Sequence, residues 1–230
     1  MIEAVFLDAG GVFFLPDAAE VHSVLAGAGP ERQVDVAGCH YRAMQALDAH
    51  PDEDVYWPAF AAAAGVDGRS TMALVPRLRR IQWTTVIAES VTGLRALANR
   101  RLRLAVVSNT EGGVEAELRR RRIAQVGEGA GTRLAAVIMS SAVGVEKPDP
   151  RIFELALEAA GASPGRTVHV GDSVHHDVDG ARAAGIRPLH FDPLRLCPQP
   201  DHDHVVSLEE VAGWPPHPRR GPAAPRRRSG

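Results

Sequence analysis

Hydrophobic residues follow two different spacings along this chain. Residues 2–7 (IEAVFL) form a short apolar run that ends at Asp-Ala-Gly-Gly, which is typical of a buried parallel strand before a tight turn. Apolar residues then recur every three or four positions, as on one face of a helix. This spacing connects Val21, Val24, Leu25 and Ala28, then Val34, Ala37, Tyr41 and Met44, and then Leu74 and Leu78. Residues 15–88 are therefore predicted to be all helical.

From residue 91 onward, helical and strand patterns alternate. The predicted strands lie at 102–107, 135–139, 167–170 and 188–191, and the predicted helices between them lie near 113–122, 150–160 and 177–184. Such alternation indicates an α/β fold with a parallel, doubly wound sheet and right-handed crossovers. Residues 1–14 and 89–213 are predicted to form this Rossmann-like core, with residues 15–88 inserted after the first strand. Residues 214–230, rich in arginine and proline, are predicted to be a disordered basic tail.

Composition narrows the classes of partner. The formal net charge is −2, so no broad basic surface for nucleic acid or anionic lipid is expected, and a small-molecule partner is predicted. No window approaches the ~20 apolar residues that span a bilayer. Cys39 and Cys197 match no metal or redox spacing, which fits a reducing compartment. A cytoplasmic protein is expected.

Polar side chains follow four of the predicted strands. In an open parallel sheet, ligands bind beyond the carboxyl ends of the strands, near the point where the strand order reverses. The residues that these strand ends deliver are Asp8, then Ser108 and Asn109, then Lys147, and then Asp172 with Asp177. Lys147 is informative because it is the only lysine among 26 basic residues. A compact ammonium group and a forked guanidinium are not interchangeable.

These residues and their order resemble the haloacid dehalogenase superfamily. The first motif of its phosphatases, DxDx[TV] after a hydrophobic strand, corresponds to residues 8–12, and Ser108 matches the second motif. Lys147, in GVEKPDPRIF, matches the third, and GDSVHHDVDGARAAG at 171–185 matches the acidic fourth. The resemblance covers residues 2–191. It implies that the helical insertion is a cap and that the chain hydrolyses small phosphorylated metabolites.

A magnesium site and a nucleophile are expected from this resemblance and from the residue chemistry. Converging carboxylates raise one another's pKa unless a cation neutralises them, and hard oxygen ligands suit Mg²⁺. We expect the ion to lie between Asp8, the main-chain carbonyl of Gly10 and Asp172, with Asp177 behind them.

The resemblance also implies the roles of the remaining residues. One oxygen of Asp8 attacks phosphorus, which gives an aspartyl-phosphate. Ser108 and Asn109 contact the phosphoryl group, and Lys147 offsets its charge. Gly10 and Gly11 let the backbone approach the phosphate closely.

Gly10 departs from the family pattern, which usually has a second aspartate there as general acid and base. Removing such a group typically costs ~10²–10⁴ in rate. The substitution favours activated leaving groups, such as aryl, acyl or anomeric phosphates. It also leaves three alternatives: a 2-haloacid dehalogenase, which Asp172 and Asp177 disfavour; a phosphonate hydrolase, which needs a cap lysine that is absent here; and a non-catalytic module that binds phosphate and metal.

Two further groups of residues invite functional interpretation. The segment Asp201-His202-Asp203-His204 is interpreted as a solvated loop before a strand at 205–206, rather than as a metal cluster. The cap residues His50, Tyr56, Trp57 and Trp83 could line a substrate entrance, but core packing is the favoured role for each.

Overall fold

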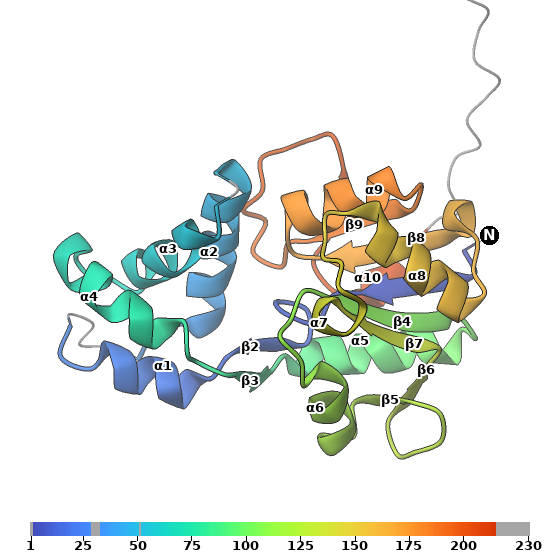
Figure 1. Ribbon diagram of the computed structural model, residues 1–230, viewed down its shortest axis with the longest axis horizontal. Coiled ribbons are helices and arrows are strands. Elements are labelled where there is room, and N and C mark those ends of the chain that lie inside the picture. Colours follow the sequence, from blue (N-terminus) through green and yellow to red (C-terminus); the bar gives the residue numbers. More distant parts are fainter. Residues whose placement is uncertain (1, 29–32, 51, 215–230) are drawn as a thin grey trace, which may run out of the picture.

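A computed structural model describes residues 2–28, 33–50 and 52–214 (Figure 1). Its centre is a six-stranded sheet in the order β10-β9-β8-β1-β4-β7, in which each neighbouring pair runs parallel. The strands are β1 (Ala4–Leu7), β4 (Arg103–Ser108), β7 (Ala136–Met139), β8 (Thr167–Gly171), β9 (Arg187–Phe191) and β10 (Asp203–Val205). The predicted α/β fold with a parallel, doubly wound sheet is confirmed.

Strand β1 lies where the strand order reverses, with β4 and β7 on one side of it and β8, β9 and β10 on the other. Leu7, its last residue, pairs with Val106 of β4 and with Val170 of β8. The three strands run in the same direction, so their carboxyl ends lie at one edge of the sheet. Open parallel sheets bind ligands at this switch point.

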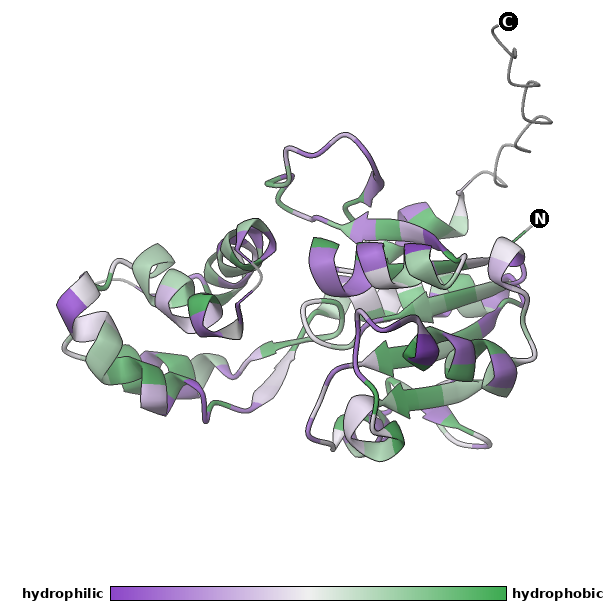
Figure 2. Ribbon diagram, turned by 45° about the horizontal axis from the view of Figure 1, so that its top comes forward, coloured by the Kyte–Doolittle hydropathy of each residue, from purple (hydrophilic) through white to green (hydrophobic). Residues whose placement is uncertain are grey.

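Both faces of the sheet are covered by helices, and Figure 2 shows hydrophobic strands between helices of mixed hydropathy. Val5 and Leu7 contribute to the core on one face, whereas Ala4 and Phe6 contribute to the core on the other. This period of two follows from the alternating side-chain directions of a strand. The covering helices are α5 (Ala88–Asn99) and α10 (Leu208–Ala212) on the first face, and α8 (Pro150–Ala160) and α9 (Gly180–Ala183) on the second.

Between β2 (Phe14–Pro16) and β3 (Trp83–Val86), the described residues of the insertion form four α-helices with a core of their own. They are α1 (Ala18–Leu25), α2 (Val36–Ala49), α3 (Tyr56–Ala63), preceded by the 3₁₀ helix η1 (Glu53–Val55), and α4 (Gly68–Leu78). Aspartates begin three of these helices, because Asp17, Asp35 and Asp67 each accept a hydrogen bond from a main-chain N–H of the first turn.

The prediction that residues 15–88 are all helical is wrong at both ends of this range. Strands β2 and β3 pair antiparallel, with Phe14 opposite Val86. This ribbon joins the helices of the insertion to the sheet (Figure 1). Strands this short show no clear period in the sequence, and partners so far apart in the chain give no local signal.

The remaining elements lie around β4, β7 and β8. They are α6 (Val114–Arg120), β5 (Ala124–Val126), β6 (Thr132–Leu134), α7 (Ser140–Val143), the 3₁₀ helix η2 (Pro164–Arg166) and the π-helix η3 (Val174–Asp179). The helix predicted near 177–184 thus begins earlier, with Ser173 as its N-cap, and continues into α9.

The predicted tail at 214–230 falls mostly outside the described residues, which end at Trp214. Trp214 itself packs against the core, and its ring centre lies 5.7 Å from the Arg187 guanidinium carbon. Within the described part of the chain, none of the helices has the length and apolar character needed to cross a membrane.

Gly93 tests the packing of α5 against α10. A Cβ atom added at Gly93 would lie 2.5 Å from Leu208 Cβ and 3.0 Å from the Glu209 main-chain nitrogen. Because these short contacts are to a Cβ atom and to backbone, the cost of overpacking should lie in the upper part of its usual range of about 1–3 kcal/mol, whereas the better helix propensity of alanine returns about 1 kcal/mol. We expect Gly93→Ala to lower the free energy of unfolding in urea by about 1–2 kcal/mol.

The matched control is Gly68→Ala in α4, where an added Cβ meets open space. Its unfolding free energy is expected to stay the same or to rise. A Gly93→Ala protein as stable as the wild type would show that α5 and α10 can separate without cost.

Candidate active site

Three aspartates meet at the carboxyl edge of the sheet. Asp8 directly follows β1, Asp172 directly follows β8, and Asp177 lies in η3. All three are buried, and each offers a carboxylate oxygen within 4.8 Å of those of the other two. The strand topology thus brings together the aspartates to which the sequence assigns metal binding.

Lys147 lies between two of these carboxylates, with a side chain that is 2% exposed. Its Nζ lies 2.8 Å from Asp8 Oδ1 and 2.7 Å from Asp177 Oδ1. Burial disfavours the ammonium group, but the carboxylates of Asp177 and Asp8 outweigh it and hold the pKa of Lys147 above its ordinary value. Lys147 is therefore a fixed positive charge inside the site.

The three carboxylates differ in how well their charge is offset. Burial raises the pKa of Asp8, against the opposing effect of Lys147. Burial also raises the pKa of Asp172, to about 6. For Asp177 burial is outweighed by Lys147 and His169, which lower its pKa below the ordinary value. The partner that opposes burial at Asp172 is His40 and not Lys147.

This donor set fits a magnesium ion. The three buried groups offer only oxygen, which Mg²⁺ prefers, and Asp8 Oδ1 receives no aligned hydrogen bond despite its contact with Lys147. A divalent cation would add positive charge beside Asp8 and Asp172, the two carboxylates whose pKa is raised.

Asp177 is held by groups from several directions. It accepts hydrogen bonds from Lys147 Nζ, from His169 Nε2 at 2.8 Å and from the Ser173 main-chain nitrogen at 3.2 Å. Gly171 leaves the room for it, since a Cβ there would lie 2.1 Å from Asp177 Cγ. Asp177 is therefore a buried acceptor inside η3 and does not cap the helix, a role that belongs to Ser173.

Ser108 and Asn109 follow one another at the end of β4. Ser108 is buried at the same edge of the sheet. The Asn109 side chain is engaged with the main chain of Lys147: its Nδ2 donates to the Lys147 carbonyl at 2.9 Å, and its Oδ1 accepts from the Lys147 nitrogen at 2.8 Å. The structure thus shows Asn109 anchoring the segment that carries the lysine.

Gly10 and Gly11 pass close to the carboxylates. Gly11 has a φ of +64°, and a Cβ there would lie 2.0 Å from Asp172 Oδ2, so a side chain is excluded. At Gly10, where the family pattern has its second aspartate, an added Cβ would lie 3.3 Å from a ring carbon of Trp83. Trp83 therefore occupies space next to the missing acid.

His40, on α2, is a site residue that the sequence did not indicate. It is 1% exposed, and its Nε2 lies 2.7 Å from Asp172 Oδ2, while its Nδ1 lies 2.8 Å from the Tyr56 hydroxyl. The Trp83 ring meets the His40 ring edge to face. No motif marks His40, because only the packing of the insertion onto the sheet brings it to Asp172.

Core packing, the role that the sequence analysis favours for the cap aromatics, is observed for Trp57, which is buried in the core of the insertion. Tyr56 and Trp83 pack in that core as well, and both also contact His40. His50, at the end of α2, is exposed.

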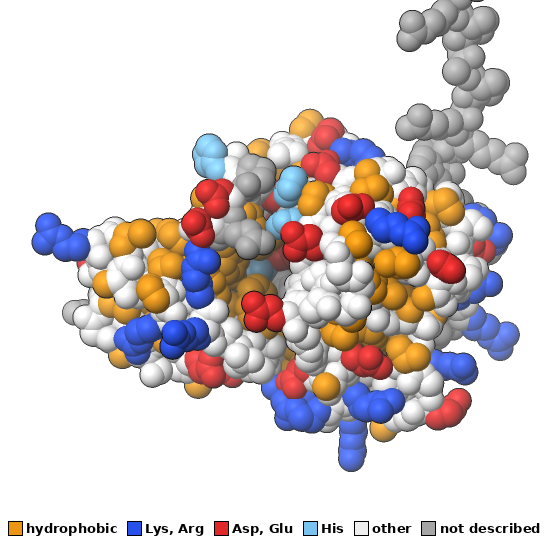
Figure 3. Space-filling model, in the orientation of Figure 1, with side chains coloured by type: hydrophobic (Ala, Val, Ile, Leu, Met, Phe, Trp, Pro, Cys, Tyr) orange, Lys and Arg blue, Asp and Glu red, His pale blue; other side chains and the backbone are white. Residues whose placement is uncertain are grey.

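A cavity of about 150 Å³ adjoins the site between α2 and the segment after β9. Its lining includes Tyr41, Asp48, Asp172, His190 and Cys197. Asp48 also accepts hydrogen bonds from the Ser173 hydroxyl at 3.0 Å and the His175 nitrogen at 3.2 Å, which ties α2 to η3. Figure 3 shows histidine side chains gathered around the hollow between the helical insertion and the sheet.

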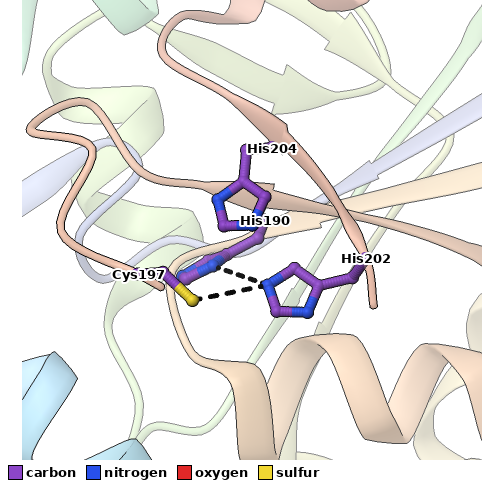
Figure 4. A group of neighbouring side chains, drawn as sticks. All are labelled: His190, Cys197, His202 and His204. Atoms are coloured by element: carbon purple, nitrogen blue, oxygen red, sulfur yellow. Dashed lines mark hydrogen bonds between the residues drawn. The ribbon is translucent and has the colours of Figure 1, made fainter. Parts of the chain in front are cut away.

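The interpretation of residues 201–204 as a solvated loop is wrong for His202, Asp203 and His204, whereas Asp201 is exposed and precedes β10. Asp203 and His204 belong to β10, and the His202 side chain is fully buried. His202 and His204 lie beside His190 and Cys197 (Figure 4). Sequence spacing missed this group because His190 comes from the neighbouring strand, where it pairs with His204.

Comparisons with known proteins identify the family and the fold. Residues 2–185 match the haloacid dehalogenase-like hydrolase family. A phosphoserine phosphatase from Thermus thermophilus is 34% identical over 140 residues, which are 61% of this chain and 54% of that protein. The match thus spans about half the length of this relative.

Solved structures share the fold. A HAD phosphatase from Thermococcus onnurineus gives a TM-score of 0.56 at 19% identity, covering 92% of this chain and 97% of that one. A 2-haloacid dehalogenase from Pseudomonas syringae gives 0.52 at 23% identity, covering 93% and 97%. With the family match over most of its length, the chain belongs to the haloacid dehalogenase-like hydrolases.

Proposed function

We propose that this hydrolase is a magnesium-dependent phosphatase that acts on small phosphorylated metabolites through an aspartyl-phosphate at Asp8. The observation that carries the proposal is the buried contact of Lys147 with both Asp8 and Asp177. A fixed ammonium beside Asp8 favours the ionised carboxylate that a nucleophile needs, and it offsets the charge of a phosphate. The relative named phosphoserine phosphatase supports a phosphorylated substrate.

Asp8, Asp172 and the main-chain carbonyl of Gly10 would hold the magnesium ion, with Asp177 orienting the group. When bound, the ion supplies positive charge that offsets the charge of the substrate phosphate. The same residues fix the nucleophile, because Asp8 is bounded by the Gly10–Gly11 turn and by Lys147.

The reaction proceeds in two displacements at phosphorus. One oxygen of Asp8 bonds to phosphorus while the bond to the leaving-group oxygen breaks, and the leaving group takes up a proton. Water then attacks the same phosphorus, the bond to Asp8 breaks, and inorganic phosphate and the free carboxylate are released. Lys147 offsets the charge on the phosphoryl oxygens, Ser108 donates a hydrogen bond to one of them, and Asn109 positions Lys147.

Residues 15–88 act as the cap in this proposal, over a core formed by residues 1–14 and 89–213. The cap contributes His40 and one wall of the cavity, so it selects the substrate. The substrate is a small molecule and not a nucleic acid, in line with the net charge of −2. Cys39 and Cys197 form no disulfide with one another, which supports a reducing, cytoplasmic location.

Replacement of the nucleophile gives the first functional test. We expect Asp8→Asn to lower the kcat for p-nitrophenyl phosphate by at least about 10³-fold, because an amide cannot form the phosphoenzyme. Removal of magnesium with a chelator should abolish wild-type turnover, and added Mg²⁺ should restore it. Phosphate release is measured with and without Mg²⁺.

Asp54→Asn is the control, since this carboxylate is exposed on the cap and should leave turnover unchanged. Turnover that persists in Asp8→Asn would contradict the nucleophile. Halide release from 2-haloacids without phosphate release would point to a dehalogenase, and Mg²⁺ binding without any turnover to a binding module.

Gly10 predicts a strong dependence on the leaving group. Without an acid at this position, we expect p-nitrophenyl phosphate to be hydrolysed at least about 10²-fold faster than benzyl phosphate, whose leaving group needs a proton. Trp83 crowds this position, so the acid is introduced together with a smaller side chain at residue 83. The double variant Gly10→Asp/Trp83→Ala should lower the ratio of the p-nitrophenyl phosphate rate to the benzyl phosphate rate, whereas the control Trp83→Ala should leave this ratio unchanged.

The readout is the ratio of kcat/KM for the two substrates in each protein, so a general loss of activity does not affect it. Equal wild-type rates for both substrates would contradict the prediction. Another side chain would then supply the proton.

A further inference from the structure

Three histidines and a cysteine gather at the edge of the sheet, outside the carboxylate site. His190 lies in β9, His204 in β10, and Cys197 and His202 in the segment between these strands (Figure 4). Each offers a ligand atom within 4.8 Å of those of the others. His190 is 5% exposed, and the His202 side chain is 0% exposed.

The shorter distances in this group match a tetrahedral metal site. His190 Nδ1 lies 3.1 Å from His202 Nε2, and Cys197 Sγ lies 3.6 Å from the same nitrogen. Zinc bonds of 2.0–2.3 Å at tetrahedral angles place neighbouring ligand atoms about 3.3–3.7 Å apart. For all four ligand atoms to bind one ion, the side chains that are farther apart need to move by about 1 Å.

The outer nitrogen of each imidazole already has an acceptor. His190 Nε2 lies 3.2 Å from the Asp172 carbonyl oxygen, and His204 Nε2 lies 3.0 Å from the Gln199 carbonyl oxygen. His202 Nδ1 lies 2.8 Å from Asp201 Oδ1. Histidines that bind metals donate their other N–H in this way to a carbonyl or a carboxylate.

In neutral rings, these partners place the hydrogen of each imidazole on its outer nitrogen and leave the inner nitrogen without a proton. Carbonyl and carboxylate oxygens only accept, so the outer nitrogens of His190, His202 and His204 carry the hydrogens of the neutral rings. His190 Nδ1 and His202 Nε2 then face one another with two lone pairs at 3.1 Å, and His204 Nδ1 lies 3.5 Å from Asp192 Oδ2. Two facing lone pairs repel unless a proton or a metal ion lies between them.

We propose that His190, Cys197, His202 and His204 bind a zinc ion, at a site separate from the magnesium site. Three imidazoles and one thiolate suit zinc rather than magnesium, which prefers oxygen. Four protein ligands complete a tetrahedral shell, so the site is structural and not catalytic.

The zinc ion fixes the segment between β9 and β10 against the sheet. This segment forms one wall of the cavity, and the Gln45 side chain of α2 donates to the Leu196 carbonyl across it at 2.8 Å. His190 also connects the zinc site to Asp172 through the carbonyl of that residue. Zinc thereby sets the shape of the cavity beside the active site.

Cobalt reports on such a site directly. Full-length protein without a histidine tag is stripped of metal and titrated with Co²⁺ in excess Mg²⁺, which fills the carboxylate site. We expect one Co²⁺ per chain with a thiolate-to-cobalt charge-transfer band and the visible bands of tetrahedral cobalt, all of which Zn²⁺ abolishes. Zn²⁺ should also raise the melting temperature.

Matched variants assign the ligands. Cys197→Ser should remove the charge-transfer band, and His202→Ala should lower the affinity for Zn²⁺ by at least about 100-fold. The control Cys39→Ser changes a thiol buried in the core of the insertion. It should keep both the charge-transfer band and the affinity for Zn²⁺.

Three results would overturn the proposal: a charge-transfer band that persists in Cys197→Ser, cobalt binding that Asp8→Asn abolishes, or a folded wild type that binds no Co²⁺. In the last case a shared proton, and not a metal, separates His190 from His202. Circular dichroism of each variant establishes that it is folded.

Discussion

In the candidate site, buried carboxylates outnumber the ammonium groups that contact them. Three buried carboxylates, from Asp8, Asp172 and Asp177, face the single ammonium group of Lys147. Burying charges is costly unless each one is paired. Asp177 receives most of the compensation and has a lowered pKa, whereas the pKa of Asp172 rises to about 6. Asp8 and Asp172, whose pKa values are raised, are therefore the carboxylates beside which the proposed cation would add positive charge.

The topology of the sheet brings these charged side chains together. Because β1 lies between β4 and β8, Asp8 follows its end at the same edge of the sheet as Ser108 of β4 and Asp172 after β8. Glycines then allow contacts that any side chain would block, at Gly11 against Asp172 and at Gly171 against Asp177. The insertion closes over this edge through His40, so both parts of the chain determine what can reach Asp8.

The sequence predicted the parts of this arrangement that carry a local signal. The buried strands and the long helix at Pro150–Ala160 have clear periodicity, and the polar residues after the strands mark the edge where the site lies. The β2–β3 ribbon, His40 and the group around His202 were missed, because each depends on contacts between segments far apart in the chain. Asn109 was predicted at the site as a phosphate ligand, but its side chain is engaged with the main chain of Lys147.

The central claim is that Asp8 becomes phosphorylated during turnover. Its most direct test is to quench the magnesium-loaded protein with acid during hydrolysis of p-nitrophenyl phosphate, to reduce it with borohydride and to sequence the peptides by mass spectrometry. Borohydride converts a phosphorylated aspartate to homoserine. The account predicts homoserine at position 8 and at no other aspartate. Turnover without this product, or homoserine at Asp172 or Asp177, would contradict it.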